Sequence, residues 1–141
     1  MIKLQNKHLK DVADFLQNNV GAKGKKNIHR MRIVKALQEG NNKLAEEEVA
    51  LLKEYAKTDE QGELVTNEKG GFDVDDKKGF NEQHKELFDE EYVIDDKNLE
   101  SAVKTVENLT NDYDKELIGK SAEAHFLLAE SIENVEGGEE E

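Results

Sequence analysis

Basic side chains gather in one short segment of the sequence, and this segment is the strongest candidate for binding chemistry. It lies where a glycine-containing loop leads into a predicted helix, and its cations are Lys23, Lys25, Lys26, Arg30 and Arg32. Backbone N–H groups at the start of a helix add to the attraction of such side chains for an anion. The segment therefore predicts docking on phosphates or on an acidic surface. The competing interpretation is that these cations only neutralise the protein's own carboxylates.

The charge of the chain is unevenly distributed, which limits the partners that it can bind. Residues 1–35 hold nine basic and two acidic residues, whereas the remaining residues hold 11 basic and 31 acidic ones. The formal net charge of the whole chain is -13, which opposes adsorption to DNA or to an anionic membrane. We therefore expect a protein partner, no membrane binding, and nucleic-acid binding only through the basic segment 23–35.

The four histidines offer no recognisable catalytic or metal-binding arrangement. His8, His29, His84 and His125 lie far apart in the sequence, and none belongs to a His-x-x-x-His or Glu-x-x-His pair on one helical face. We expect surface or boundary positions for all four. His125 borders the apolar stripe of the last predicted helix, so we expect it to be partly buried and to need one hydrogen-bond partner.

A cluster of aspartates offers oxygen ligands but not in the spacing of a known cation loop. Asp73, Asp75 and Asp76 could hold Ca²⁺ or Mg²⁺ weakly, yet an EF-hand starting at Asp73 would have Lys78 in place of glycine and His84 in place of glutamate. We interpret the cluster as a solvated acidic turn, with no metal and no cofactor. Phosphate loops, dinucleotide-binding glycine patterns and nucleophile elbows are missing, and so is cysteine. The sequence therefore predicts no enzyme.

Apolar periodicity predicts a mainly α fold with a minor β component. We expect one long helix or a helical hairpin, three shorter helices and a small β-hairpin or sheet, all in a single domain over residues 1–136. Residues 137–141 are Gly-Gly-Glu-Glu-Glu and have no apolar side chain to bury, so they predict a disordered acidic tail. Proline is absent, which permits long uninterrupted helices.

The longest helical pattern covers residues 25–57. Leu37, Leu44 and Leu51 repeat every seven residues, which indicates a seam for another helix. The alternate seam positions hold Asn41 and Glu48, which disfavour a long dimeric coiled coil. Around Gly40-Asn-Asn the pattern is open to two outcomes, one kinked helix or two separate helices.

Shorter elements flank this helix. Apolar and polar side chains alternate from Ile2 to Leu4, so a strand is expected there. A first helix follows from Asn6 as its N-cap, with apolar residues at helical spacing at Leu9, Val12, Ala13 and Leu16. A hairpin is expected over residues 62–75, a helical pattern covers 80–90, and Asp95 or Asp96 caps another helix. The strand at 92–94 pairs either with the hairpin or with the first strand. Ser121 is the expected N-cap of the last helix, whose buried face is either Ala122, Phe126, Ala129 and Ile132, or Ile132 with Leu128 and Val135.

Three segments of the sequence together resemble a known family. They are Asn-Lys-His-Leu at 6–9, Lys-Gly-Lys-Lys-Asn-Ile-His-Arg-Met-Arg-Ile-Val-Lys-Ala-Leu at 23–37, and Glu-Glu-Glu-Val-Ala-Leu-Leu-Lys-Glu-Tyr-Ala at 46–56. The chain resembles a family of small uncharacterised proteins encoded by tailed phages and prophages of Gram-positive bacteria. The resemblance implies a phage origin and a gene among late structural or lysis-region genes. The sequence departs from the family's pattern at Asn27-Ile28-His29, directly before Arg30, where the resemblance implies Ser-Arg-like residues.

Two classes of function are compatible with these observations. The first is a non-enzymatic, phage-encoded interaction or assembly protein, accessory or chaperone-like, with a phage or host protein as partner and homo-oligomerisation left open. The second is an acidic inhibitor of a host defence protein or nuclease, whose carboxylates imitate DNA phosphates. The candidate acidic runs for this role are residues 46–48, 59–63, 73–76, 89–91 and 139–141. The amino terminus lacks the apolar run of a signal peptide, so we expect the host bacterial cytoplasm or association with the virion.

Overall fold

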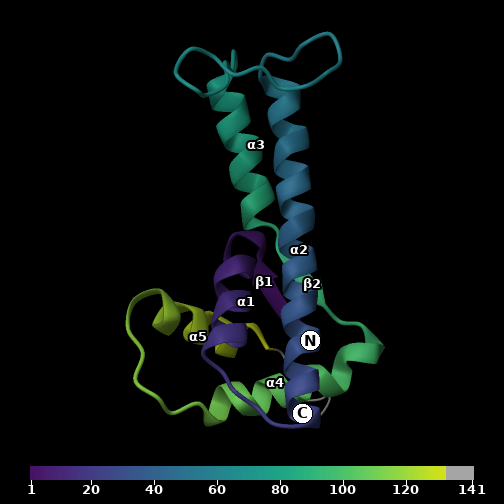
Figure 1. The fold of residues 1–141 in the computed structure, drawn as a ribbon, viewed down its shortest axis with the longest axis vertical. Helices are drawn as coiled ribbons and strands as arrows, with labels where there is room; N and C mark the ends of the chain where they lie inside the picture. Colours follow the sequence, from purple (N-terminus) through teal and green to yellow (C-terminus); the bar gives the residue numbers. More distant parts are fainter. Residues whose placement is uncertain (133–141) are drawn as a thin grey trace, which may run out of the picture. The chain divides into compact units, whose positions relative to one another are not determined.

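The computed structural model describes residues 1–132 and is mainly helical with a small sheet, as the sequence predicts (Figure 1). Within these residues the chain forms two compact units, unit 1 from residues 1–41 and 91–132 and unit 2 from residues 42–90. The single domain over 1–136 stays a prediction, and the predicted acidic tail lies outside the described residues. Beside one long helix, the described part holds four shorter α-helices, each of which corresponds to a helical pattern in the sequence: α1 (Leu9–Asn18), α3 (Lys77–Asp89), α4 (Glu100–Asp112) and α5 (Gly119–Ser131).

The long helix α2 (Lys25–Tyr55) is continuous, so neither a break nor a second helix occurs at Gly40. This glycine is buried because the ring of Tyr92 lies against it. A Cβ at Gly40 would meet ring carbons of Tyr92 at 2.7 to 2.9 Å, closer than van der Waals contact permits. The Tyr92 hydroxyl also donates a hydrogen bond to the carbonyl of Ala36 at 3.2 Å. The glycine therefore lets the ring of Tyr92 pack directly against the backbone of α2. Its lower helix propensity costs about 1 kcal/mol relative to alanine.

The sheet of unit 1 has two antiparallel strands, β1 (Ile2–Gln5) and β2 (Glu91–Ile94). Ile2 is opposite Ile94 in the register, and Leu4 is opposite Tyr92. Of the two predicted pairings for the segment 92–94, the pairing with the first strand is therefore correct. Ile2 also forms a single antiparallel bridge with Ile132, which brings the end of the described chain to β1.

The hairpin predicted over residues 62–75 does not form two regular strands. Unit 2 has isolated antiparallel bridges there instead, one between Thr66 and Phe72 and another between Thr58 and Leu64. A two-stranded ribbon without a packed face is marginal in water, and this loop is exposed along most of its length. The backbone is held by local turns, and Gly62 and Gly70 adopt the positive φ that these turns require.

The hydrophobic core lies in unit 1 and is built from all of its elements. The apolar spacing predicted for the first helix is confirmed, because the corresponding side chains of α1 are buried. The strands, the first part of α2, and helices α4 and α5 supply the other members. Side chains that are fully or nearly fully buried in this core include Ile2, Leu9, Val12, Leu16, Ile33, Val34, Leu37, Val106 and Leu128.

The buried face of α5 contains Ala124, Leu128 and Ser131, whose spacing of four and three residues places them on one side of a helix. The predicted face containing Phe126 is wrong, because Phe126 is 62% exposed. Leu128 belongs to the second predicted face and is fully buried. Val135, the other member of that face, lies outside the described residues.

Two predicted N-caps are wrong. Asn6 lies inside a short 3₁₀ helix (Asn6–His8), where it is buried, and α1 begins only at Leu9. Helix α5 begins at Gly119, two residues before the expected cap Ser121. A second 3₁₀ helix (Lys97–Leu99) follows Asp96, so the helix expected there starts as α4 at Glu100. Short 3₁₀ turns commonly open α-helices, and apolar spacing alone does not place such boundaries.

Candidate interaction surfaces

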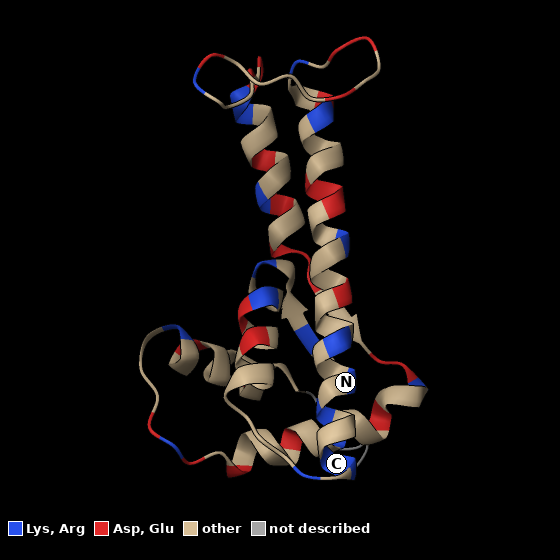
Figure 2. Cartoon of the chain, viewed as in Figure 1, with Lys and Arg blue, Asp and Glu red and all other residues tan. Residues whose placement is uncertain are grey.

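Four residues in the first turns of α2 form a stripe on its exposed side. Lys25, Ile28, Arg32 and Lys35 follow one another at spacings of three or four residues, which places them on one helical face. All four are exposed, and Ile28 is 51% exposed. Basic residues are visible along these turns of α2 in Figure 2. We call these four residues the basic stripe.

The predicted cationic residues do not all belong to this stripe. Lys25 and Arg32 do, whereas Lys23 is exposed in the preceding loop and Lys26 is exposed on another face of the helix. Lys35 completes the stripe although the sequence prediction left it out of the site. Its spacing of three residues from Arg32 is the signal that identifies it once the helix is known.

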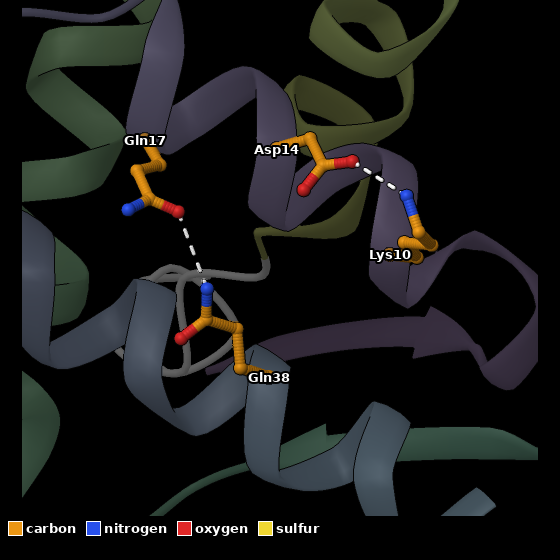
Figure 3. A network of polar contacts seen from close by, with 4 residues as sticks. All are labelled: Lys10, Asp14, Gln17 and Gln38. Atoms are coloured by element: carbon orange, nitrogen blue, oxygen red, sulfur yellow. Dashed lines mark hydrogen bonds and ion pairs between the residues drawn. The ribbon is translucent and has the colours of Figure 1, made fainter. Parts of the chain in front are cut away.

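Arg30 has a different role from its neighbours, because its guanidinium points to the end of α1. Nη1 donates hydrogen bonds to the carbonyls of Leu16 at 2.8 Å and Gln17 at 3.0 Å. Nη2 donates to Oδ1 of Asn27 at 2.6 Å. Carbonyls in the last turn of a helix lack partners within the helix, so Arg30 satisfies them from α2. Gln38 adds a second polar link from α2 to Gln17, shown in Figure 3.

The basic first third of the chain does not form a unit of its own. Residues 1–41 pack with residues 91–132, a stretch with four basic and ten acidic residues. On the exposed side of α1, Lys10 Nζ lies 2.9 Å from a carboxylate oxygen of Asp14 (Figure 3). The hydrogen bond to Asp14 raises the pKa of Lys10 above its ordinary value. Part of the positive charge is thus balanced locally, as the neutralisation interpretation requires.

His29 is buried rather than at the surface or boundary, which corrects the sequence prediction. Its Nδ1 lies 2.7 Å from the hydroxyl oxygen of Thr105 on α4. The two side chains join α2 to α4 inside unit 1. A buried polar group is stable when it has such a partner, so this contact is sufficient to explain the position of His29.

His125 is half-buried with one hydrogen-bond partner, as the sequence predicts. Nε2 donates to the carbonyl of Thr110 at 3.0 Å. The imidazole also packs against two aromatic rings, with centroids 5.6 Å from Phe15 and 5.4 Å from Tyr113. This small cluster joins α1, α5 and the connector that follows α4.

In unit 2, aromatic side chains connect α2 and α3. Tyr55 and Phe80 pack edge to face with centroids 5.9 Å apart, and the rings of His84 and Phe88 stack at 4.3 Å. Nε2 of His84 lies 2.7 Å from Oε2 of Glu48. Glu48 is one of the polar residues that disfavoured a long coiled coil. The seam predicted along the long helix therefore does contact another helix. At Glu48 and Tyr55 this helix is α3 of the same chain.

Several carboxylates of the predicted acidic runs hold the loop of unit 2 together. Asp76 caps α3 by accepting a hydrogen bond from the N–H of Gly79 at 2.9 Å. Asp59 accepts hydrogen bonds from two backbone N–H groups within its own turn, and Asp73 accepts a hydrogen bond from the side chain of Asn67. Across residues 1–132, no group of three or more His, Asp or Glu side chains is arranged to hold a metal ion.

The chain matches no family model, no curated protein and no solved structure. The resemblance to phage proteins therefore stays a prediction. In the part of the chain that the structure describes, none of the helices has the length and apolar character to cross a membrane.

Proposed function

We propose that this protein is a non-enzymatic interaction or assembly protein that acts through protein–protein contacts of unit 2. One observation carries the proposal. In residues 42–90, all of which the structure describes, Leu44 alone is buried, and every other apolar side chain of α2 and α3 stays partly or largely exposed. Val49 on α2 is 45% exposed, and Phe72 in the loop is 39% exposed.

The physical reason is that a helix pair gains most of its stability by burying an apolar face against other elements. Unit 1 achieves this with a shared core, whereas no member of that core belongs to unit 2. Removing apolar surface from water is favourable by about 25 cal/mol per Å². A partner that covers the half-exposed side chains of α2 and α3 would therefore stabilise both the complex and the helix pair.

The use of the histidines supports a non-enzymatic role. His29 pairs with Thr105, His125 donates to a backbone carbonyl, and His84 contacts Glu48 within an aromatic stack. General acid–base catalysis needs such a group within reach of a substrate proton. Here each contact joins two segments of the fold, so structure accounts for all three side chains.

The DNA-mimic alternative is less well supported. A mimic needs rows of carboxylates that are free to face a partner as phosphates are, and several acidic residues of unit 2 already have a partner within that unit. Those with partners are Glu48 with His84, Asp59 with its own turn, Glu63 with Lys53, Asp73 with Asn67, Asp76 with Gly79, and Asp89 with Lys85. The row at residues 139–141 lies outside the described part of the chain.

The setting of this function is proposed from the resemblance alone. It is a bacterium that carries a phage or prophage, with the protein in the host cytoplasm or attached to the virion. The partner would then be a phage protein or a host protein.

Site-specific photo-crosslinking in cells that carry the gene tests the proposal. A photoreactive phenylalanine analogue is placed at Ala50 or at Phe72, both exposed in unit 2, and at the exposed Phe126 of unit 1 as the matched control. We expect a protein adduct of defined mass from the first two positions and none from the control. If neither unit 2 position gives a protein adduct, the proposed function is refuted. An adduct to a DNA-binding protein that is displaced by duplex DNA would favour the mimic.

A further inference from the structure

The basic stripe has an apolar residue at its centre, which distinguishes it from a purely solvated set of charges. Ile28 is exposed, with Lys25 three residues before it and Arg32 four residues after it. These spacings place the two cations about one helical turn on either side of the isoleucine. The exposed surface is therefore an apolar anchor between two positive charges.

The second half of α2 carries the complementary arrangement. Leu51 is partly exposed, with Glu47 four residues before it and Glu54 three residues after it, and both glutamates are exposed. We call Glu47, Leu51 and Glu54 the acidic face. It belongs to unit 2, which has seven basic and fifteen acidic residues. The surface is again an apolar residue one turn from two charges, now negative, but Leu51 belongs to the predicted seam and is less exposed than Ile28.

The two patterns match when the helices run in opposite directions. With Ile28 placed against Leu51, the residue three before the isoleucine meets the residue three after the leucine, so Lys25 meets Glu54. In the same register Arg32 meets Glu47. An apolar contact flanked by opposite charges is the arrangement by which antiparallel helices select a partner and a register.

We propose that a second copy of this chain docks the basic stripe of its α2 onto the acidic face of α2 in the first copy. This inference rests on the proposed function and names the partner for it. The match in spacing and charge sign is the reason to choose a second copy over an unrelated basic protein. The net charge of -13 makes two copies repel at a distance, but physiological salt screens that repulsion beyond about 8 Å. The pairs within the contact act at shorter range.

The test is sedimentation velocity of the full chain over a wide concentration range, with charge-reversed variants. We expect the wild-type protein to self-associate. Lys25→Glu with Arg32→Glu, or Glu47→Lys with Glu54→Lys, should each weaken association at least about tenfold. A mixture of the two double variants should associate again, because each keeps the surface that the other has lost. The variant with all four changes should also recover self-association.

Controls carry equal charge changes on exposed residues outside both surfaces. Lys26→Glu with Lys97→Glu matches the first variant, and Glu82→Lys with Glu86→Lys matches the second. Circular dichroism establishes that each variant is folded. Wild-type protein that stays monomeric at every concentration, controls as weakened as the test variants, or a mixture that fails to associate would each overturn the inference.

The photo-crosslinking experiment separates this inference from the proposed function. An adduct from Ala50 with the mass of two copies of the chain supports both. An adduct to a different protein keeps the proposed function and refutes the second copy as partner.

Discussion

Replacing Gly40 by alanine tests whether the contact with Tyr92, and not flexibility of α2, explains a glycine inside the long helix. The added Cβ would meet three ring carbons of Tyr92 at 2.7, 2.8 and 2.9 Å. The ring cannot easily give way, because its hydroxyl is hydrogen-bonded to the carbonyl of Ala36. Overpacking of this kind costs about 1 to 3 kcal/mol, whereas alanine gains about 1 kcal/mol of helix propensity over glycine. We expect Gly40→Ala to lower the free energy of unfolding by about 1 kcal/mol.

The sign should reverse when the ring is removed. In a Tyr92→Ala background the clash is absent, so Gly40→Ala should raise the free energy of unfolding by about 1 kcal/mol. Urea denaturation followed by circular dichroism gives all four corners of this double-mutant cycle. Ala45→Gly, at an exposed position of the same helix, calibrates the propensity difference. A stabilising Gly40→Ala in the wild-type background, or a coupling of less than about 0.5 kcal/mol, would refute the reasoning.

Three further predictions concern unit 1. Arg30→Ala should lower the free energy of unfolding by about 2 kcal/mol, because it removes charge-assisted hydrogen bonds at the end of α1, whereas Arg32→Ala at the exposed stripe should change it by less than about 0.5 kcal/mol; equal effects in urea denaturation would contradict this role of Arg30. Leu128→Ala should cost about 3 kcal/mol as a cavity in the core, and Phe126→Ala in the same helix should be nearly neutral; thermal unfolding measures both, and a larger loss at Phe126 would show that α5 packs through its other face. Burial, and to a lesser degree two nearby carboxylates, raise the pKa of Tyr92 above its ordinary value of 10.0. Since the unfolded chain then loses this proton first, the stability from the neutral hydroxyl is complete below pH 10 and falls as pH rises through the folded pKa. Tyr92→Phe should therefore lose less stability than the wild type between pH 9 and pH 11, about the range in which tyrosine ionises, and parallel stability curves would contradict the shift.

Periodicity in the sequence determined much of the secondary structure. The apolar side chains of α1 recur at helical spacing and are buried in the structure, because a helix in water is stabilised mainly by its apolar stripe. The absence of proline agreed with an unbroken α2. Alternation at Ile2 to Leu4 correctly indicated a strand. Local composition sufficed in these cases because the relevant contacts follow from spacing along a single element.

The sequence was less informative where the side chain acts on a distant residue. Arg30 looked like a member of the cationic group, but its guanidinium is engaged with α1, which is 13 and 14 residues away in the chain. His29 looked like a surface residue, yet its partner Thr105 is 76 residues away. Phe126 belonged to one of the two predicted buried faces of α5, yet it is 62% exposed. The prediction failed because the apolar type of a side chain does not specify which face of a short helix meets its neighbour.

Sequence alone thus established the helical class, the absence of cysteine chemistry and the positions of opposite charge along the chain. Tertiary structure decided that Gly40 accepts a ring instead of breaking the helix, and that Glu48 faces a histidine of α3. It also decided which cations of α2 stay exposed as the basic stripe. The physical reason is that helical spacing fixes which residues share a face, whereas packing between elements fixes which faces are covered.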